Sequence, residues 1–448
     1  MAVYKTTQVV FIITTLVGLI TPIAVDPGQP CPAPPPCTCR IPGSMIDCSG
    51  KGLSHVPGIS NGGQQRWTVD ISYNQLTTIP KRAFENITVV SLNMSHNKIS
   101  TLSMDCLVGS NDVVTSVHME SNQFWYLPNA IDDLTNLEIL TMQDNPFIIL
   151  GTSMSFASTL RYLTIGSENS PWPKYIDQLN AITHLTVVGL TCYSLPFDAF
   201  FNMAGTMKSL VLQNNECNDM PDSVQVLTNL EHLAVIDNHL LTSFDIHNLT
   251  SLTSLVIENS SLSTMPNISK CTHLLSIYVT DSPIKSWELD TIPPESKLRN
   301  ITLDRTDFDH IPTALRQIPL VENLLMKNTN VSNIEDSDLS TLFLLRNLDL
   351  SNASLEGIAV TAFKQNTMLY SISLDNTNLA GVPRAIGEVD SLYVLNMLGD
   401  SIECTCKELG WMRLWGALEH FVTGSGTCQN TGMDLMTYIR EYVPKCAT

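Results

Sequence analysis

The stretch LEHLAVIDN, residues 230–238, decides the fold of this chain. Apolar residues occupy its first, fourth and sixth positions and an asparagine its ninth, which is the pattern L-x-x-L-x-L-x-x-N. Because Leu233 and Val235 alternate with their neighbours, their side chains point to one side of a short strand. The same pattern returns in LTSLVIENS (252–260), LRNITLDRT (298–306) and LRNLDLSNA (345–353).

The pattern repeats along most of the chain. Fifteen copies follow one another at intervals of 22 to 25 residues, and they begin at Arg66, Val89, Val114, Leu137, Leu160, Ile182, Met207, Leu230, Leu252, Leu274, Leu298, Val321, Leu345, Leu369 and Leu392. A period of this length is typical of a solenoid, in which each repeat contacts only its neighbours.

Each repeat continues with a turn and a return segment. A further apolar residue stands two places after the asparagine, as at Leu76, and an apolar–proline pair such as Ile79-Pro80 then turns the chain. The return segment carries another apolar residue, such as Phe84 or Phe363. No single repeat can bury these side chains, whereas stacked repeats bury them in one column. We therefore predict a parallel sheet with strands about 4.8 Å apart.

Cysteines gather at the two ends of the repeats. The stretch CPAPPPCTCR (31–40) begins a first set, and the last repeat runs into a second; the sets are Cys31, Cys37, Cys39 and Cys48, and Cys404, Cys406, Cys428 and Cys446. The open ends of a solenoid core must be capped. Prolines and disulfides constrain a segment that has little core of its own. The sequence alone leaves three pairings for each set.

Together, the repeats and the cysteine sets resemble the extracellular leucine-rich repeat proteins with cysteine-rich caps, such as Slit, Nogo receptor and the variable lymphocyte receptors. The resemblance covers residues 31–446 and implies an α/β solenoid, a leucine-rich repeat horseshoe with a parallel β-sheet on its concave face and disulfide caps at both ends. It divides the chain into a cap (26–65), repeats (66–400) and a second cap (401–448). It also implies the pairs Cys31–Cys39, Cys37–Cys48, Cys404–Cys428 and Cys406–Cys446.

In that family, the ninth-position asparagine bonds neighbouring backbone in a ladder. Asparagine fills this position at Asn74, Asn97, Asn122, Asn145, Asn215 and Asn238. Glu168 and Leu190 interrupt it, and the later repeats carry Ser260, Ser282, Thr306, Thr329, Ala353, Thr377 and Asp400. We therefore expect a weaker ladder in the second half and around the fifth and sixth repeats. In the second cap, we expect Trp411 to pack into the end of the core with Leu409 and Leu414.

Four cysteines lie within the repeats. Cys192 and Cys217 both stand two residues past the ninth position of adjacent repeats, so they are roughly 5 Å apart across the sheet. This separation suits a disulfide, and it equally suits two packed thiols. Cys106 and Cys271 lie too far apart along the stack to bond each other, and we expect both to be buried thiols.

The N-terminus indicates a secreted protein, and the net charge argues against some classes of partner. One basic residue, Lys5, precedes a short apolar run and small residues near Ala24, which predicts a signal peptide over residues 1–25. A membrane anchor is the alternative, but the run is short for a span. The formal net charge of -19 argues against nucleic acid or anionic membranes as partners. We expect structural disulfides and no membrane anchor.

No catalytic constellation stands out in the sequence. The P-loop, H-E-x-x-H, G-x-S-x-G and Rossmann fingerprints do not occur, so we expect no enzyme, no cofactor and no metal centre. His96, His118 and His184 fall at exposed strand positions, where solvated histidines are expected. The carboxylates Asp304, Asp307 and Asp309 lack the glycine and distal glutamate of an EF-hand, which favours solvated surface over a calcium site.

Glycosylation sequons divide the expected concave face. They occur at Asn86, Asn93, Asn248, Asn259, Asn267, Asn300, Asn330 and Asn352. Asn93, Asn259, Asn300 and Asn352 would shield part of repeat two and the face from repeat nine onward. On the bare face of repeats three to eight, Val188 and Ile236 among polar neighbours suggest a protein-binding patch. The residues expected there are Glu120, Asp144, Tyr162, Val188, Gln213, Ile236 and Asp237.

These features predict a secreted, glycosylated binding or adhesion protein that recognises another extracellular protein through its concave face. The alternative is an acidic structural component of the extracellular matrix, associated with calcium or mineral. Dispersed surface acids favour this alternative only weakly, because they do not form long runs.

Overall fold

The structure is a computed structural model that describes residues 31–40, 44–63, 65–146, 153–168, 171–173, 176–192, 195–418 and 423–446. The predicted signal peptide, residues 1–25, lies outside the described residues. The chain forms two compact units. Of the described residues, unit 1 comprises those from 31 to 145 and 153–159, and unit 2 comprises residue 146 and those from 160 to 446.

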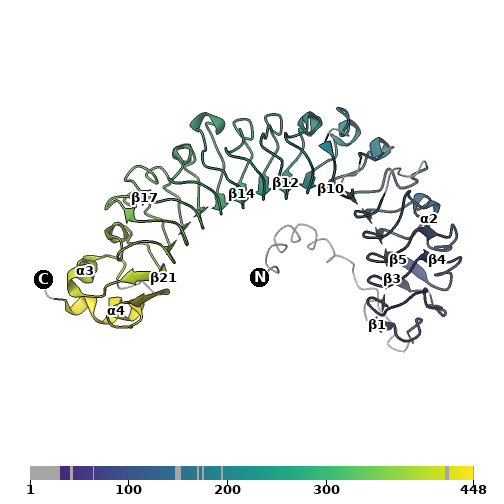
Figure 1. The fold of residues 1–448 in the computed structure, drawn as a ribbon, viewed down its shortest axis with the longest axis horizontal. Coiled ribbons are helices and arrows are strands. Elements are labelled where there is room, and N and C mark those ends of the chain that lie inside the picture. The colour runs from purple at the N-terminus through teal and green to yellow at the C-terminus, as the bar shows by residue number, and fades with distance from the viewer. Residues whose placement is uncertain are drawn as a thin grey trace. The chain divides into compact units, whose positions relative to one another are not determined.

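Unit 1 is a stack of repeats that begins with a hairpin, drawn in purple (Figure 1). Strand β1 (Thr38–Arg40) pairs antiparallel with β2 (Met45–Asp47), and the described pairings that follow in this sheet are parallel. The sheet continues through β3 (Arg66–Asp70), β5 (Thr88–Asn93), β7 (Ser116–His118) and β8 (Ile139–Thr141). The turns carry β4 (Thr78–Ile79), β6 (Thr101–Leu102) and α2 (Asn129–Asp132).

Unit 2 continues the same architecture. Its strands, in sheet order, are β9 (Tyr162–Ile165), β10 (His184–Val188), β11 (Ser209–Gln213), β12 (His232–Ile236), β13 (Ser254–Glu258), β14 (Ser276–Thr280), β15 (Asn300–Asp304), β16 (Asn323–Leu325), β18 (Asn347–Asp349), β20 (Ser371–Ser373), β21 (Val394–Ile402) and β22 (Thr423–Cys428). Like positions pair with like positions, as Leu233, Leu255 and Ile277 show. The predicted parallel solenoid is therefore confirmed.

The return segments of unit 2 contain short helical turns rather than long α-helices, so the helix content is low. Three of the turns begin directly after Pro221, Pro312 and Pro383, whose fixed backbone φ suits a sharp change of direction. The elements outside the main sheet are η1 (Ile176–Gln178), η3 (Phe201–Met203), η4 (Asp222–Val226), η5 (Leu289–Thr291), η6 (Thr313–Gln317), β17 (Asn333–Ile334), β19 (Gly357–Ile358), η7 (Arg384–Glu388), α3 (Cys406–Leu409), η8 (Gly410–Leu414), α4 (Leu435–Glu441) and η9 (Val443–Lys445).

The apolar positions of the repeat form the core. Leu233 and Val235 of β12 are each 1% exposed, and Leu76, Phe84 and Phe363 are fully buried. The strand leucines and the return-segment aromatics thus pack between the sheet and the outer turns, as the period predicts.

The asparagine ladder ties successive repeats together, and Asn122 shows its geometry. Its side-chain amide donates to the Met94 carbonyl of the preceding repeat at 3.0 Å and to the carbonyls of Met119 and Glu120 in its own repeat at 3.2 Å. Its Oδ1 atom accepts the Ile99 backbone N–H at 2.9 Å. One side chain therefore joins two repeats through four backbone groups, and its Oδ1 atom pairs the Ile99 N–H.

The ladder changes character in unit 2. Ser282 still links two repeats, because its hydroxyl accepts the Ser260 backbone N–H at 3.1 Å. Thr306 and Thr329 donate only within their own repeats, to the carbonyls of Leu303 at 3.4 Å and Met326 at 3.1 Å. Among the described residues, neither hydroxyl bonds the preceding repeat, so the ladder thins where the sequence predicts that it should.

A backbone feature that was not predicted precedes the ladder position in most repeats. The residue before the ladder position adopts a left-handed conformation in most repeats, with φ of 57° at Asp144, 54° at Asp237 and 59° at Asn352. Asparagine, aspartate and glycine tolerate this region best. The signal lay in the sequence, since Gly189, Asn214, Asp237, Asn259, Asp281, Asn328, Asn352, Asn376 and Gly399 all occupy this position.

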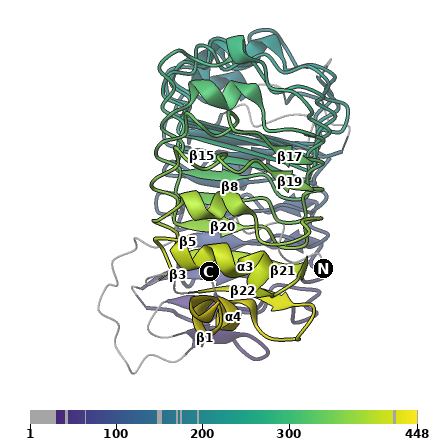
Figure 2. The ribbon, with the colours of Figure 1, turned by 90° about the vertical axis from the view of Figure 1, so that its left-hand side faces the viewer.

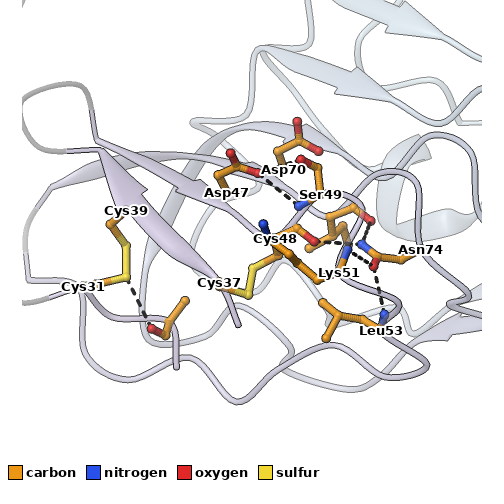
Figure 3. The surroundings of a disulfide bond; sticks show 12 residues. Cys31, Cys37, Cys39, Asp47, Cys48, Ser49, Lys51, Leu53, Asp70 and Asn74 are labelled. Atoms are coloured by element: carbon orange, nitrogen blue, oxygen red, sulfur yellow. Dashed lines mark hydrogen bonds between the residues drawn. A yellow bond between two sulfur atoms is a disulfide. The ribbon is translucent and has the colours of Figure 1, made fainter. Parts of the chain in front are cut away.

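The terminal cysteines pair as the resemblance implies. The first cap contains Cys31–Cys39 and Cys37–Cys48, and the second contains Cys404–Cys428 and Cys406–Cys446. Figure 3 shows that the ladder begins at the first cap. Asn74 accepts the backbone N–H groups of Lys51 at 3.0 Å and Leu53 at 2.9 Å, and donates to the Cys48 carbonyl at 2.9 Å.

The inner cysteines divide into a pair and two thiols. Cys192 and Cys217 form a disulfide between adjacent repeats, with their Cα atoms 5.1 Å apart. Cys106 and Cys271 are buried free cysteines, and burial raises the pKa of each thiol to about 12. Both therefore remain protonated and unreactive at neutral pH.

The second cap corrects one prediction. Helices α3 and α4 close the C-terminal end beside β22, in yellow (Figure 2). Leu409 is buried as expected, but Leu414 is 84% exposed and Trp415 is 4% exposed. Because a 3₁₀ turn brings every third residue to one side, Met412 and Trp415 face inward and Leu414 faces away. The Trp415 indole N–H donates to the Val389 carbonyl at 3.0 Å, whereas Trp411 is half-buried.

Asp400 occupies a ladder position that suits an amide better than a carboxylate. Its Oδ1 atom accepts the Thr377 backbone N–H at 2.7 Å, as Asn238 accepts that of Asn215 at 2.9 Å. Asn238 then donates from Nδ2 to two carbonyls, but the corresponding Oδ2 of Asp400 is buried and has no hydrogen-bond partner among the described residues. Burial raises the pKa of the Asp400 carboxyl, and nearby Asp375 raises it further.

Asp400→Asn is therefore expected to stabilise unit 2 by about 1 kcal/mol at pH 7, because the amide restores the missing donor. A raised carboxyl pKa means that the folded state holds more protons, so the stability of the parent protein falls as pH rises above the ordinary aspartate value. The gain should shrink toward pH 4. Urea unfolding at both pH values measures it, with exposed Asp290→Asn as the matched control. A gain in the free energy of unfolding that does not depend on pH, or that Asp290→Asn also gives, would contradict the role of the unpaired Asp400 carboxylate.

Candidate functional site: the strand face of unit 2

The strands of unit 2 present one open face, on the inner side of the arc that holds β10, β12 and β14 in Figure 1. Third, fifth and seventh positions of each repeat point toward this face, and we call it the strand face. On four adjacent strands the fifth positions are apolar or aromatic: Val211, Ala234, Val256 and Tyr278. We name these four residues the apolar stripe. Ala234 is 9% exposed, and the other three are half-buried.

One edge of the strand face, at the start of the strands, carries histidines and paired charges. His184 stacks on Tyr162 with ring centroids 4.4 Å apart. Burial lowers the pKa of His184, and the nearby His232 lowers it further, which outweighs the opposing effect of Glu231. Lys208 pairs with Glu231 at 2.7 Å. His184 is therefore neutral at pH 7, and this edge has little net charge.

The opposite edge, at the end of the strands, is acidic. It consists of Asp237, Glu258, Asp281 and Asp304 together with Arg305. The Arg305 guanidinium lies 2.5 Å from Asp281 Oδ1 and 2.7 Å from Asp304 Oδ2. We name these five residues the acidic edge, and it borders the apolar stripe along β12 to β15.

The structure places the predicted ligand residues in both units. Tyr162, Val188, Gln213, Ile236 and Asp237 lie on the strand face of unit 2 or at its rim. Val188 is half-buried as a surface residue should be, but Ile236 is only 7% exposed, because neighbours on β11 and β13 flank it. The expected exposed apolar centre at Ile236 is therefore corrected.

Two further predicted residues belong to unit 1. Glu120 accepts a hydrogen bond from the Thr141 hydroxyl, and Thr141 also contacts His118 Nδ1 at 3.0 Å. Asp144 is exposed and has a left-handed backbone. Within unit 1 they lie on neighbouring repeats, and they stay separate candidates from the residues of unit 2.

Val211, Val256 and Tyr278 were missed by the sequence reasoning. The predicted apolar surface residues, Val188 and Ile236, both stand at the seventh position of their repeats. The fifth positions alternate in the same strands and point the same way, so the same period-two reading would have found the apolar stripe.

The sequon asparagines occupy different environments. Asn248, Asn267 and Asn330 are exposed outside the strands, as is Asn86, whose amide donates to the Ile59 carbonyl at 2.9 Å. Asn259 donates to Asp237 at 2.8 Å and Asn300 to the Ser276 hydroxyl at 3.1 Å. The remaining two are Asn93, whose Oδ1 accepts the Ser95 N–H at 3.1 Å, and Asn352, which accepts from Asn376 at 3.1 Å.

The carboxylates Asp304, Asp307 and Asp309, which are close in the sequence, do not form a common site. Asp304 pairs with Arg305 and accepts from Asn328 at 2.6 Å, whereas Asp309 contacts His310 at 2.5 Å in the following turn. Within the described ranges, no group of three or more His, Cys, Asp or Glu side chains is arranged to hold a metal ion. Those ranges also contain no helix with the length and apolarity needed to cross a bilayer.

Comparison with known sequences gives distant matches. No family model matches the chain. It is 25% identical over 223 residues to human leucine-rich repeats and immunoglobulin-like domains protein 3, covering 49% of the chain and 17% of that protein. It is 22% identical over 323 residues to adenylate cyclase of Schizosaccharomyces pombe, covering 70% and 18%. The chain thus spans less than a fifth of these relatives, and the second likeness is too low to show a shared activity.

Solved structures match the fold. A leucine-rich repeat protein of Leptospira interrogans, LIC12759, has a TM-score of 0.63 at 19% identity, covering 85% of this chain and 95% of that chain. The functional domain of InlJ from Listeria monocytogenes, which includes a cysteine ladder, has a TM-score of 0.52 at 15% identity, covering 79% and 73%. A chain of the Drosophila Toll–Spatzle complex has a TM-score of 0.54 at 15% identity, covering 75% and 47%. These likenesses show the leucine-rich repeat fold.

Proposed function

We propose that this protein binds another protein through the strand face of unit 2. The observation that carries the proposal is the apolar stripe on β11 to β14, in which Val211, Val256 and Tyr278 are partly exposed beside the buried Ala234, with polar residues along both edges. An apolar centre with a polar rim is the anatomy of a protein interface. The fold supports the proposal, because solenoids offer extended surfaces of this kind for binding.

We further propose that the protein acts outside the cell. Five disulfides join described residues, and such bonds persist in oxidising compartments. Residues 1–25 would then be a signal peptide, and the exposed sequons outside the strands, Asn86, Asn248, Asn267 and Asn330, would carry glycans. Glycans on these four would leave the apolar stripe accessible, whereas a glycan on Asn259 or on the exposed Asn300 would narrow access to Val256 and Tyr278.

The proposal is tested by binding of the purified protein to an array of extracellular proteins, with calcium and again with a chelator. A partner that binds regardless of the chelator and is lost with Val256→Arg supports it. The matched control is Val360→Arg, the same substitution at a residue that is 57% exposed on an outer turn. Binding that survives Val256→Arg, or that requires calcium, would overturn the proposal and favour the acidic matrix function.

A further inference from the structure

The two edges of the strand face differ in net charge. Along β11 to β15, the acidic edge carries four carboxylates against the single guanidinium of Arg305. On the opposite edge, Lys208 pairs with Glu231 at 2.7 Å and Arg299 pairs with Glu322 of the next repeat. The formal sums are therefore -3 on the acidic edge and 0 on the opposite edge of one apolar stripe. Any partner that covers the stripe therefore meets a negative border on one side only.

The pKa of Tyr278 reflects the charges around the β14 end of the apolar stripe. Burial raises the pKa of its phenol, and the carboxylates of Asp304 and Glu258 raise it further despite the opposing guanidinium of Arg305. The carboxylates therefore outweigh the guanidinium at this point on the strand face. Tyr278 is half-buried, so its ring offers an apolar and π surface to a cation held by the neighbouring acids.

The charge also argues against a second copy of the chain as the occupant. The formal net charge is -19, and copies that met through the acidic edge would bring like charges together. Like-charge contacts across an interface disfavour the wrong partner, whereas complementary charges favour and orient the right one. The occupant that fits is a positively charged one.

We infer that the acidic edge binds a basic segment of the partner protein, with lysine or arginine side chains against Asp237 and Glu258 while apolar side chains of the same segment cover the stripe. This inference rests on the proposed function, because it names the chemistry of the partner for the same surface. The one-sided charge also fixes the orientation, since only one way of placing the segment puts its basic side along the acidic edge.

The test uses a phage-displayed library of random peptides selected on the purified full chain. The selected peptides are then synthesised and measured by fluorescence anisotropy against three variants. Asp237→Asn with Glu258→Gln removes two charges from the acidic edge, and asparagine suits the left-handed backbone of residue 237. Asp290→Asn with Glu295→Gln removes two exposed charges from the segment that follows β14. Val256→Arg blocks the apolar stripe.

We expect selected peptides rich in lysine or arginine, with roughly five- to tenfold weaker binding to the acidic-edge variant and unchanged binding to the control. Their affinity should also fall with added salt, because exposed charges are screened. Peptides that lose binding to Val256→Arg but not to the acidic-edge variant would overturn the inference and leave the proposed function standing. Peptides indifferent to both variants, or no selected peptides, would overturn both.

Discussion

Asn122→Ala is expected to destabilise unit 1 by about 3 kcal/mol. The substitution removes an amide that donates to carbonyls of two repeats at a position that is 7% exposed, and it leaves the Ile99 N–H without its partner. Thr306→Ala in unit 2 should cost only about 1 kcal/mol, because the threonine hydroxyl bonds a carbonyl of its own repeat and links no neighbour. The same ladder position thus has two different energetic roles.

Hydrogen exchange followed by mass spectrometry measures this difference repeat by repeat. Amides of β7 and β8 should exchange faster in Asn122→Ala, because loss of the rung lets adjacent repeats open locally. Amides of β15 and β16 should change little in Thr306→Ala. Thermal unfolding of both variants gives the corresponding global loss. Equal destabilisation by the two substitutions would show that the ladder does not hold unit 1 more firmly than the middle of unit 2.

Trp415→Ala is expected to have a still larger effect, about 4 kcal/mol. The indole is 4% exposed and donates to the Val389 carbonyl, so the substitution creates a cavity at the end of the core and removes that hydrogen bond. The cavity would lie directly under the C-terminal cap, where Met412 and Leu409 also face inward.

Leu414→Ala is the matched control for this cavity, since it removes an apolar side chain one residue away that is 84% exposed. Its effect should lie within about 0.5 kcal/mol of zero. Urea unfolding followed by circular dichroism compares the two variants without relying on tryptophan fluorescence. A large loss in Leu414→Ala would restore the packing that the sequence predicted and would refute the inward orientation of Trp415.

The repeat period explains why so much of the fold was predictable. Leucines at the fourth and sixth positions can be buried only by stacking, so the spacing from Arg66 to Leu392 fixes the strands, their parallel pairing and their register. The terminal cysteine sets likewise mark where the core needs caps. The sequence also locates the weak part of the ladder, because threonine cannot reach as far as asparagine.

Other features depend on contacts that the period does not describe. The seventh position predicts that Ile236 points outward, but its exposure depends on the side chains of β11 and β13 beside it. The second cap does not follow the repeat pattern. Local packing therefore decides which side of η8 faces the core, and with it whether Leu414 or Trp415 is buried. Whether Cys192 bonds Cys217 depends on side-chain direction, which separation alone leaves open.

The disulfide between adjacent repeats has a mechanical consequence. A solenoid pulled from its ends should unravel one repeat after another, because each repeat contacts only its neighbours. Cys192 and Cys217 are 25 residues apart in sequence, which corresponds to roughly 85 Å of extended chain. While the bond is intact, that length cannot be drawn out under tension. The bond follows Glu168 and Leu190, where the asparagine ladder is interrupted. The disulfide therefore lies next to the repeats that we expect to unfold first under tension.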